Sequence, residues 1–329
     1  MQSSDVWAIG IDLGGTKTDV GLVESGGHIR RRLRRVTPVK GGPTLIKTDI
    51  VAAVHELLDP ISSVPVGVGV GLAGQIDSRE GNVIFAPNLD WRNVPFQRDL
   101  SQALGLPVVI TNDVRAITWG EWLHGAGQGC NDLICLFVGT GIGGGIVSEG
   151  KVLSGSTNAA GEIGHLVIDW NGPSCTCGNR GCLEAFAGGW AVARHAQEIV
   201  ARDPSAGSVL LEMVGGKRES ITAETVARAA HAGDPLAKQL VDRVAEALIA
   251  GSVSLIHAFN PSRLILGGGV IEGIPELAHR VTDGVRQRAL VASTKGLEIL
   301  PSKLKENAGI VGAAMLAIHT FGKKDRHHG

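Results

Sequence analysis

The chain has 329 residues, enough for two domains of ordinary size, and its formal net charge of −1 gives no general attraction to nucleic acid or to anionic membranes. Its five cysteines include a cluster of three, which leaves too few for a disulfide framework and makes the cytoplasm the expected compartment. The N-terminal residues lack the basic and apolar regions of a signal peptide, and no apolar run is long enough to span a membrane.

The first predicted unit is a pair of strands joined by a glycine turn. The first strand, 6–13, carries Asp12 near its end, the turn is Gly14-Gly15-Thr16-Lys17, and the returning strand covers 19–23. A third strand, 28–39, is rich in arginine. These arginines could form a basic patch for nucleic acid, but an exposed edge strand whose charges discourage pairing is the better interpretation.

Helices and strands alternate through the next hundred residues. The expected elements are a helix that ends at Leu58, a strand over 64–72, a loop through Trp91, a helix over 96–104, a strand over 108–111 and a helix over 114–124. The strand before Gly74 alternates valine with glycine, which predicts that another backbone approaches it closely. The later strand stops at Asn112-Asp113, directly before its helix.

The second half repeats this plan. A strand over 132–138 leads into a glycine turn that begins Gly139-Thr140-Gly141 and extends to Gly145, and a returning strand follows over 146–148. The remaining expected elements are helices over 183–202, 222–231 and 234–259, a strand over 263–266 that ends in Gly267-Gly268-Gly269, a helix over 275–290, a strand over 297–300 and a helix over 308–318.

Strands that run into helices and glycine turns predict an α/β protein with its site at the carboxyl ends of the strands. We expect two similar α/β lobes that face a cleft. The small lobe covers 1–113, with a C-terminal helix of about 306–320 returning to it, and the large lobe covers 114–305. The tail, 321–329, is expected to be disordered.

A metal site is predicted in the large lobe. Cys175, Cys177 and Cys182 have C-x-C-x4-C spacing, and His165 lies upstream. Three thiolates and one imidazole suit tetrahedral Zn²⁺ in a structural site, whereas buried unpaired thiols are the alternative. Glycines between the cysteines allow the positive φ that a loop needs where it turns around an ion.

The glycine clusters that follow strands are typical of a nucleotide cleft, because backbone N–H groups reach phosphate oxygens where side chains are absent. None fits the Walker A pattern, and each taken alone is better explained as a tight turn. Asp12 could orient Mg²⁺ or cap its turn. Asp113 is the candidate general base for a hydroxyl that attacks phosphorus, although spacing alone favours a helix N-cap.

Together these motifs resemble the signature series of the ROK family, named for repressors, open reading frames and kinases. The matching segments are DLGGTK at 12–17, ND at 112–113, GTGIGGG at 139–145, EIGH at 162–165, CTCGNRGCLE at 175–184 and GGG at 267–269. The resemblance covers the chain from about Trp7 to Ile318.

The resemblance implies an actin-like ATPase fold with two ribonuclease-H-like lobes that close on ATP and a sugar. It implies an ATP- and Mg²⁺-dependent kinase for the 6-hydroxyl of glucose, with Asp113 as the base and a structural zinc bound by His165, Cys175, Cys177 and Cys182. It places six residues around the sugar: Gly74, Asn112, Asp113, Glu162, His165 and Glu184. It assigns the phosphates to Asp12, Gly14, Gly15, Thr16, Lys17, Gly139, Thr140 and Gly141, and the adenosine to Gly267, Gly268 and Gly269.

Several alternatives remain open from the sequence. An N-acetylglucosamine or N-acetylmannosamine kinase would use the same acids and histidine, and the choice of sugar can depend on one or two loop residues. Polyphosphate is a conceivable donor in place of ATP. A sugar-responsive repressor is less expected, because only a few residues precede the first strand and Asp113 is intact. We expect no nucleic-acid or membrane partner, and the resemblance implies a homodimer or homotetramer.

Overall fold

The computed structural model describes residues 6–59, 61, 63–77 and 80–322. Its first five-stranded sheet has the order β3-β2-β1-β4-β8. The strands are β1 (Trp7–Leu13), β2 (Lys17–Glu24), β3 (Ile29–Val36), β4 (Val68–Leu72) and β8 (Val108–Asn112). β1 pairs antiparallel with β2 and parallel with β4, and β4 pairs parallel with β8. The expected strand–turn–strand unit is therefore present, and the arginine-rich strand lies at the edge of the sheet.

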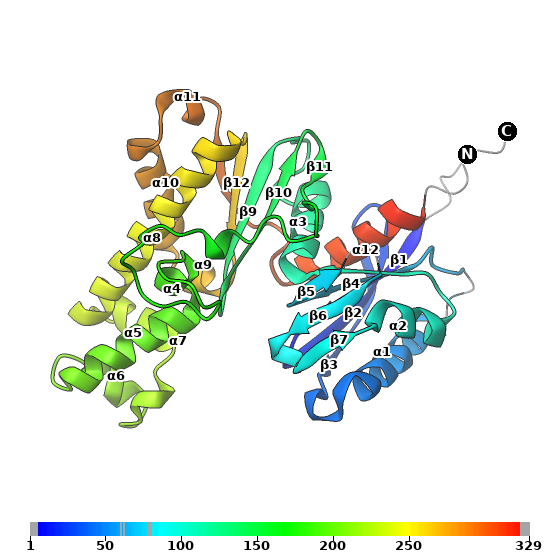
Figure 1. Cartoon of the computed structure of the whole chain (residues 1–329), viewed down its shortest axis with the longest axis horizontal. Helices are drawn as coiled ribbons and strands as arrows, with labels where there is room; N and C mark the ends of the chain where they lie inside the picture. The colour runs from blue at the N-terminus through cyan, green and yellow to red at the C-terminus, as the bar shows by residue number, and fades with distance from the viewer. Residues whose placement is uncertain (1–5, 60, 62, 78–79, 323–329) are drawn as a thin grey trace.

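Alternating residues of β1 face two different helical layers. Ile9 and Ile11 pack toward α1 (Gly42–Leu58) and α2 (Phe96–Leu104), whereas Ala8 packs toward α12 (Ala308–Phe321), which covers the other face (Figure 1). α12 lies very close to the sheet. A Cβ on Gly69 would stand 1.8 Å from the carbonyl oxygen of Ala313. The close backbone approach predicted from the valine–glycine alternation is therefore confirmed.

The second five-stranded sheet has the order β11-β10-β9-β12-β13 and repeats the plan of the first. Its strands are β9 (Leu133–Val138), β10 (Ile142–Ser148), β11 (Lys151–Val152), β12 (Arg263–Gly267) and β13 (Glu298–Pro301). The hairpin of β9 and β10 corresponds to that of β1 and β2, and the parallel neighbours β12 and β13 correspond to β4 and β8. The internal repeat read from the sequence is thus a repeat of sheet topology.

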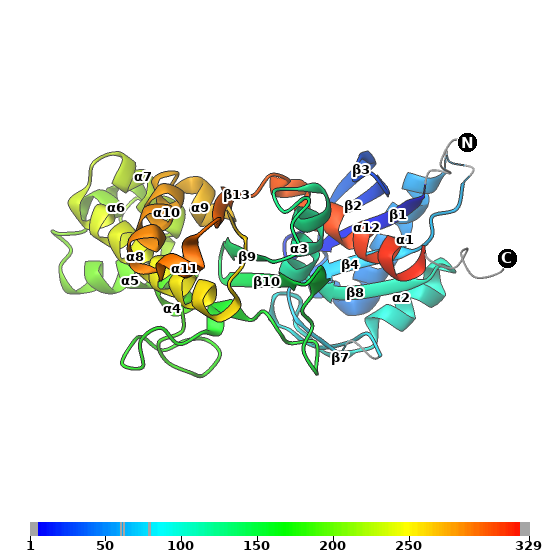
Figure 2. The ribbon, with the colours of Figure 1, turned by 90° about the horizontal axis from the view of Figure 1, so that it is seen from above.

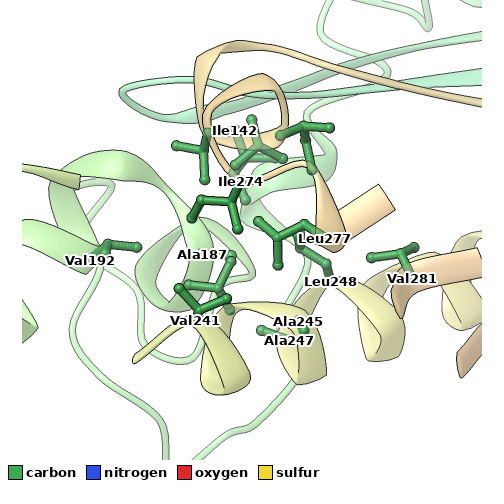
Figure 3. Close-up of a cluster of buried hydrophobic side chains, with 14 of the residues drawn as sticks. Ile142, Ala187, Val192, Val241, Ala245, Ala247, Leu248, Ile274, Leu277 and Val281 are labelled. Atoms are coloured by element: carbon green, nitrogen blue, oxygen red, sulfur yellow. The ribbon is translucent and has the colours of Figure 1, made fainter. Parts of the chain in front are cut away.

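Helices around α8 form the large core beside this sheet. Figure 3 shows Leu248 of α8 beside Leu277, and Ile274 beside Ile142, with all of these side chains buried. The helices here are α4 (Glu184–Ala187), α5 (Gly189–Arg202), α6 (Ser208–Met213), α7 (Ala223–His231), α8 (Pro235–Phe259), α9 (Gly269–Gly273), α10 (Glu276–Arg288) and α11 (Val291–Thr294). α8 begins as predicted, because the Asp234 carboxylate accepts a hydrogen bond of 2.7 Å from the Ala237 N–H.

The helix α3 (Asp113–His124) lies between the two sheets and against α12 (Figures 1 and 2). At its far end the fully buried Glu121 carboxylate accepts hydrogen bonds from the Ala126 N–H, the Ser302 hydroxyl and the Leu304 N–H, at 2.8, 2.6 and 2.8 Å. These donors belong to the two segments through which the chain passes between the sheets. One carboxylate therefore ties both connections together.

Some expected elements differ from the structure. The loop through Trp91 contains a small third sheet of β5 (Gln75–Asp77), β6 (Asn82–Ala86) and β7 (Trp91–Val94). The helix expected over 183–202 breaks at Gly188 into α4 and α5. β4 begins four residues later than predicted. Short 3-10 turns occupy Val39–Gly41, Pro87–Leu89, Ile163–His165, Arg218–Ser220 and Lys305–Asn307.

Four of the five arginines of β3 are bound to acidic side chains, and the fifth, Arg31, donates to the Glu56 and Leu57 carbonyls at 3.2 and 2.8 Å. Arg30 pairs with Glu24, Arg32 and Arg34 share Asp19, and Arg35 pairs with Asp49. Their charge is thus largely neutralised within the edge of the sheet, in agreement with the interpretation as an edge strand. In the described part of the chain, no helix combines the length and apolarity that a membrane crossing requires. The tail expected to be disordered lies mostly outside the described residues, although α12 includes Phe321.

Candidate active site and metal centre

The turn between β1 and β2 lies at the carboxyl end of β1, and its residues are partly or fully exposed. The Gly14 N–H donates to the Lys17 carbonyl at 3.0 Å, and the Thr37 hydroxyl donates to the Gly14 carbonyl at 2.7 Å. Thr16 and Lys17 are exposed. A Cβ on Gly15 would stand 2.7 Å from the carbonyl oxygen of Asn88, so only glycine allows the turn and the segment between β6 and β7 to lie this close.

Asp12 is half-buried beside this turn. Burial, together with the negative charges of Asp113 and Asp19, raises the pKa of Asp12 from 3.8 to about 6. Its carboxylate faces Gly309, where a Cβ would stand 2.7 Å from the carboxyl carbon. A carboxylate held against other acids in this way is stabilised by a cation, so Asp12 fits a Mg²⁺ ligand or an orienting partner of its waters.

Asp113 follows β8 and opens α3. Asn112, not Asp113, is the N-cap, because its Oδ1 accepts hydrogen bonds from the N–H groups of Val114 and Arg115. The expectation from spacing that Asp113 caps the helix is therefore wrong. Burial raises the pKa of Asp113 above its ordinary value, and the charge of Glu162 adds to the rise. A base with a raised pKa matches proton abstraction near neutral pH better than an ordinary aspartate.

The second glycine turn is shorter than the sequence suggested. Gly139-Thr140-Gly141 forms the turn, with the Gly139 N–H donating to the Gly141 carbonyl at 2.9 Å, whereas Gly143, Gly144 and Gly145 lie within β10. These later glycines make room for side chains: a Cβ on Gly144 would stand 2.1 Å from Ile163. The expectation that the glycine turn extends to Gly145 is therefore wrong, because Gly143, Gly144 and Gly145 are strand residues that leave space for neighbouring side chains.

The third cluster joins the carboxyl ends of two neighbouring strands. Gly267 ends β12, and Gly268 has a φ of +93°. A Cβ on Gly268 would stand 2.6 Å from the Val138 carbonyl oxygen at the end of β9. Gly269 opens α9 and has open space at its Cβ position. All three glycine clusters thus lie at carboxyl ends of central strands, as a nucleotide cleft requires.

The predicted metal ligands come together. The ligand atoms of His165, Cys175, Cys177 and Cys182 all lie within 4.8 Å of one another. The Cys177 and Cys182 sulfurs are 3.8 Å apart, and the Cys175 sulfur is 3.8 Å from Nδ1 of His165. Bonds of about 2.3 Å at tetrahedral angles place two sulfurs about 3.8 Å apart, so the donor set fits zinc in both chemistry and spacing. The other two cysteines, Cys130 and Cys135, are buried outside this group.

The remaining sugar candidates occupy different settings. Glu162 is exposed directly before the turn that carries His165, and its charge acts on Asp113. Glu184 opens α4, and its two oxygens accept hydrogen bonds from the Ile142 N–H at 2.7 Å and from the Trp190 indole at 3.1 Å. A carboxylate has about four acceptor sites, so both oxygens of Glu184 retain capacity for further donors.

Gly74 and Asn112 meet at the opposite side of this region. The Asn112 amide donates to the Gly74 carbonyl at 3.4 Å. Gly74 itself has no room for a side chain, because a Cβ would stand 2.7 Å from the Phe85 carbonyl oxygen. Asn88, which lies against the Gly15 turn, was missed by the sequence reasoning. The Pro–Asn pair in a segment read as a plain loop was its only sequence signal.

Comparison with known proteins identifies the family. The ROK family pattern matches residues 8–320. The chain belongs to the ROK family.

This ROK chain is 37% identical over 317 residues to a glucokinase of Thermotoga maritima, covering 95% of the chain and 98% of that protein. It is similar to a solved ROK glucokinase of Streptomyces griseus in complex with glucose and AMPPNP, at 36% identity and a TM-score of 0.76 over 95% of this chain and 99% of that one. A ROK hexokinase of Thermus thermophilus matches at 31% identity and a TM-score of 0.82, over 96% and 99%. The fold is therefore the actin-like ATPase fold, and the ROK chain is an ATP-dependent sugar kinase.

Proposed function

We propose that this ROK kinase is a glucokinase, which transfers the γ-phosphoryl group of ATP to the 6-hydroxyl of glucose. The observation that carries the proposal is the setting of Asp113. This carboxylate follows the last strand of the first sheet, has a raised pKa, and is close enough to Asp12 and Glu162 for their charges to interact. The identity to glucokinases of known name supports glucose as the acceptor.

In the proposed reaction, Asp113 accepts the proton of the 6-hydroxyl as that oxygen forms its bond to the γ-phosphorus and the bond to the ADP oxygen breaks. Its raised pKa makes the carboxylate a stronger base than an ordinary aspartate. Asp12 is the residue that would hold Mg²⁺ or its waters. When bound, that cation would neutralise charge on the phosphates.

The glycine clusters support a nucleotide position between the sheets. We assign the phosphates to the two hairpin turns, Gly14 to Lys17 and Gly139 to Gly141, because their backbones are open at strand ends. We assign the adenosine to Gly267 to Gly269, which lie where β12 leads into α9. Backbone N–H groups at such turns bind anions without a charged side chain.

A structural zinc is part of the proposal. His165, Cys175, Cys177 and Cys182 would bind it, with Nδ1 of the imidazole toward the ion, since Nδ1 is the ring nitrogen near Cys175. Nε2 then carries the hydrogen and can donate to a sugar hydroxyl. Zinc would thus fix the loop on which Glu162 and Glu184 flank the metal ligands. These two carboxylates would accept hydrogen bonds from sugar hydroxyls, and Asn112 and the Gly74 backbone would form further hydrogen bonds with the sugar.

We also propose the division into lobes at 1–113 with 306–320 and at 114–305, which the two separate sheets support. A cytoplasmic location is proposed because thiols that bind zinc persist under reducing conditions. A homodimer or homotetramer is proposed from the family resemblance.

The test is a coupled ADP-release assay with Mg-ATP and each of glucose, mannose, N-acetylglucosamine and N-acetylmannosamine. We expect turnover with glucose to exceed the others, and NMR of the product to show phosphate on the 6-oxygen. In a parallel series polyphosphate replaces ATP, and formation of the sugar phosphate is followed by NMR because this donor releases no ADP. Preference for an N-acetylhexosamine or for polyphosphate would overturn the proposed substrate or donor.

Asp113→Asn tests the catalytic assignment within the same assay. We expect kcat to fall by about 10² to 10⁴, because the amide cannot accept the proton. Asp99→Asn is the matched control, since Asp99 is also an acid in the first turn of a helix, in α2, outside the proposed site. Full activity of Asp113→Asn would refute the role of this residue.

A further inference from the structure

A buried arginine lies two residues after the proposed base. Arg115 is 5% exposed, and its side chain leaves the first turn of α3. Its guanidinium donates to the Asn158 carbonyl at 3.0 Å, to the Asn158 side-chain oxygen, and to the Ala160 carbonyl at 2.8 Å. All of these acceptors belong to the segment 154–161, which precedes Glu162. We call this segment the 154–161 loop.

Among the described residues, the hydrogen bonds of the Arg115 guanidinium all go to neutral acceptors, namely the Asn158 carbonyl and side-chain oxygens and the Ala160 carbonyl. Burial lowers the pKa of Arg115, and the negative charge of Glu162 opposes this shift. A buried cation with neutral acceptors costs stability, so its presence beside Asp113 and Glu162 needs a reason.

The acceptor Asn158 continues the contact to a third element. It has a φ of +61°, the left-handed region, which asparagine tolerates better than most residues. Its side-chain amide donates to the Ile76 carbonyl at 3.3 Å, on β5 just after Gly74. Arg115 and Asn158 therefore join the first turn of α3, the 154–161 loop and the strand that follows a proposed sugar contact.

The chain directly after Glu162 is held in place by packing. Ile163 is buried and occupies the space left by the missing Cβ of Gly144 in β10. The 154–161 loop before Glu162, in contrast, has the sequence SGSTNAAG. It is largely exposed, and its small and polar residues have little apolar surface to bury. The hydrogen bonds of Arg115 therefore restrain the residues just before Glu162, together with the Asn158–Ile76 bond and the bond of 3.1 Å from the Ala160 N–H to the Ser154 carbonyl.

We propose that Arg115 is a positioning residue of the sugar site, which through Asn158 and Ala160 holds Glu162 at a fixed spacing from Asp113. This inference rests on the proposed function and adds a residue that touches neither sugar nor nucleotide. We expect its effect on sugar binding, because the proposed contact of Glu162 is with a sugar hydroxyl away from the reacting 6-oxygen and would be made both before and during phosphoryl transfer. Loss of such binding raises KM and leaves kcat largely unchanged.

Arg115→Lys tests this most directly, since lysine keeps the buried charge but cannot donate to Asn158 and Ala160 in the fork geometry of a guanidinium. We expect the KM for glucose to rise about tenfold or more, while kcat and the KM for Mg-ATP change less than about threefold. Asn158→Gly keeps the positive φ and the backbone acceptor but loses the bond to Ile76 and the side-chain oxygen that accepts from Arg115, so we expect a smaller rise. In the double variant the two effects should not add, because both residues act through one contact.

Amide hydrogen exchange provides a readout that does not depend on activity. We expect faster exchange across the 154–161 loop in Arg115→Lys and unchanged exchange across 175–182. Glu121→Gln is the control, since it also alters a buried charge on α3 but contacts no residue of the loop.

The outcomes separate this inference from the proposed function. If the wild-type protein phosphorylates none of the sugars, the proposed function fails, and the exchange data alone judge Arg115. If glucose is phosphorylated but the folded Arg115→Lys variant has a KM for glucose within about twofold of wild type, the positioning role is refuted. It is also refuted if kcat falls and the KM values for glucose and Mg-ATP both rise together. Unchanged exchange in the loop refutes it as well.

Discussion

Asp12 and Asp19 lie directly opposite each other on β1 and β2 but have opposite electrostatic surroundings. Burial and neighbouring acids raise the pKa of Asp12 to about 6. Burial alone would also raise the pKa of Asp19, but hydrogen bonds from Arg34 and Arg32 outweigh it, and the net pKa is lowered. Without nucleotide or Mg²⁺, Asp12→Asn should therefore stabilise the protein near neutral pH, whereas Asp19→Asn should destabilise it.

The sign and size follow from linkage between protonation and folding. A carboxyl whose pKa is higher in the folded state binds its proton more tightly there, so its ionisation lowers the free energy of unfolding. A rise from 3.8 to about 6 corresponds to about 3 kcal/mol at neutral pH. Because Asp12 is half-buried and water screens part of the effect, we expect Asp12→Asn to gain about 1 to 3 kcal/mol. The gain should shrink as the pH falls below about 6 and vanish below about 4, where both states are protonated.

The assay is urea unfolding followed by tryptophan fluorescence, in chelated buffer, at several values between about pH 5 and pH 8. Asp19→Asn is the matched control on the opposite strand. We expect it to lose about 1 to 3 kcal/mol at neutral pH, because Arg32 and Arg34 lose their shared acceptor. Equal stability of Asp12→Asn and wild type near pH 7.5, or a gain that does not change with pH, would refute the reasoning.

Other predictions concern the metal and the packing. Cys177→Ser should weaken glucose binding at least about tenfold while nucleotide binding persists, because the proposed zinc orders the loop that carries the sugar contacts. Calorimetric titration of the variant with each ligand measures both affinities. An unchanged glucose affinity in the zinc-free variant would contradict this prediction. Gly69→Ala should cost more than about 3 kcal/mol, because its Cβ would collide with the Ala313 carbonyl, whereas Gly273→Ala, which has open space, should be nearly neutral in the same denaturation experiment. Glu121→Gln should cost about 2 to 4 kcal/mol without altering which sugar is preferred, because an amide group would face backbone donors; a stability equal to wild type argues against the buried carboxylate as the tie between the two connections.

The sequence predicted the strand–glycine–strand units well because both signals are local. The Asp12 to Lys17 turn needs glycine for close approach, and apolar runs of five to eight residues on either side fix the strands. The grouping of the four candidate metal ligands was also predictable, since the three cysteines lie within eight residues and His165 lies just before their loop. In such cases, the distance along the chain already limits the distance in space.

The parts that failed depend on contacts between distant segments. Gly143 to Gly145 looked like a continuing turn, but they are strand residues that make room for Val114, Ile163 and Thr118. The sheet of β5, β6 and β7 has short strands whose polar residues give no clear alternation. Arg115 gave no sequence signal, because nothing local links it to residues 158–160. Only the fold brings these groups together.

The close contact of α12 with β1 and β4 has a consequence for synthesis on the ribosome. The face of β1 that bears Ala8 and Gly10 is covered by residues near position 310, which are synthesised long after β1. Until those residues emerge from the ribosome, that face of the first sheet has no native cover and is open to cellular chaperones. Premature stop codons shortly before α12 should therefore yield aggregating chains and not shortened kinases.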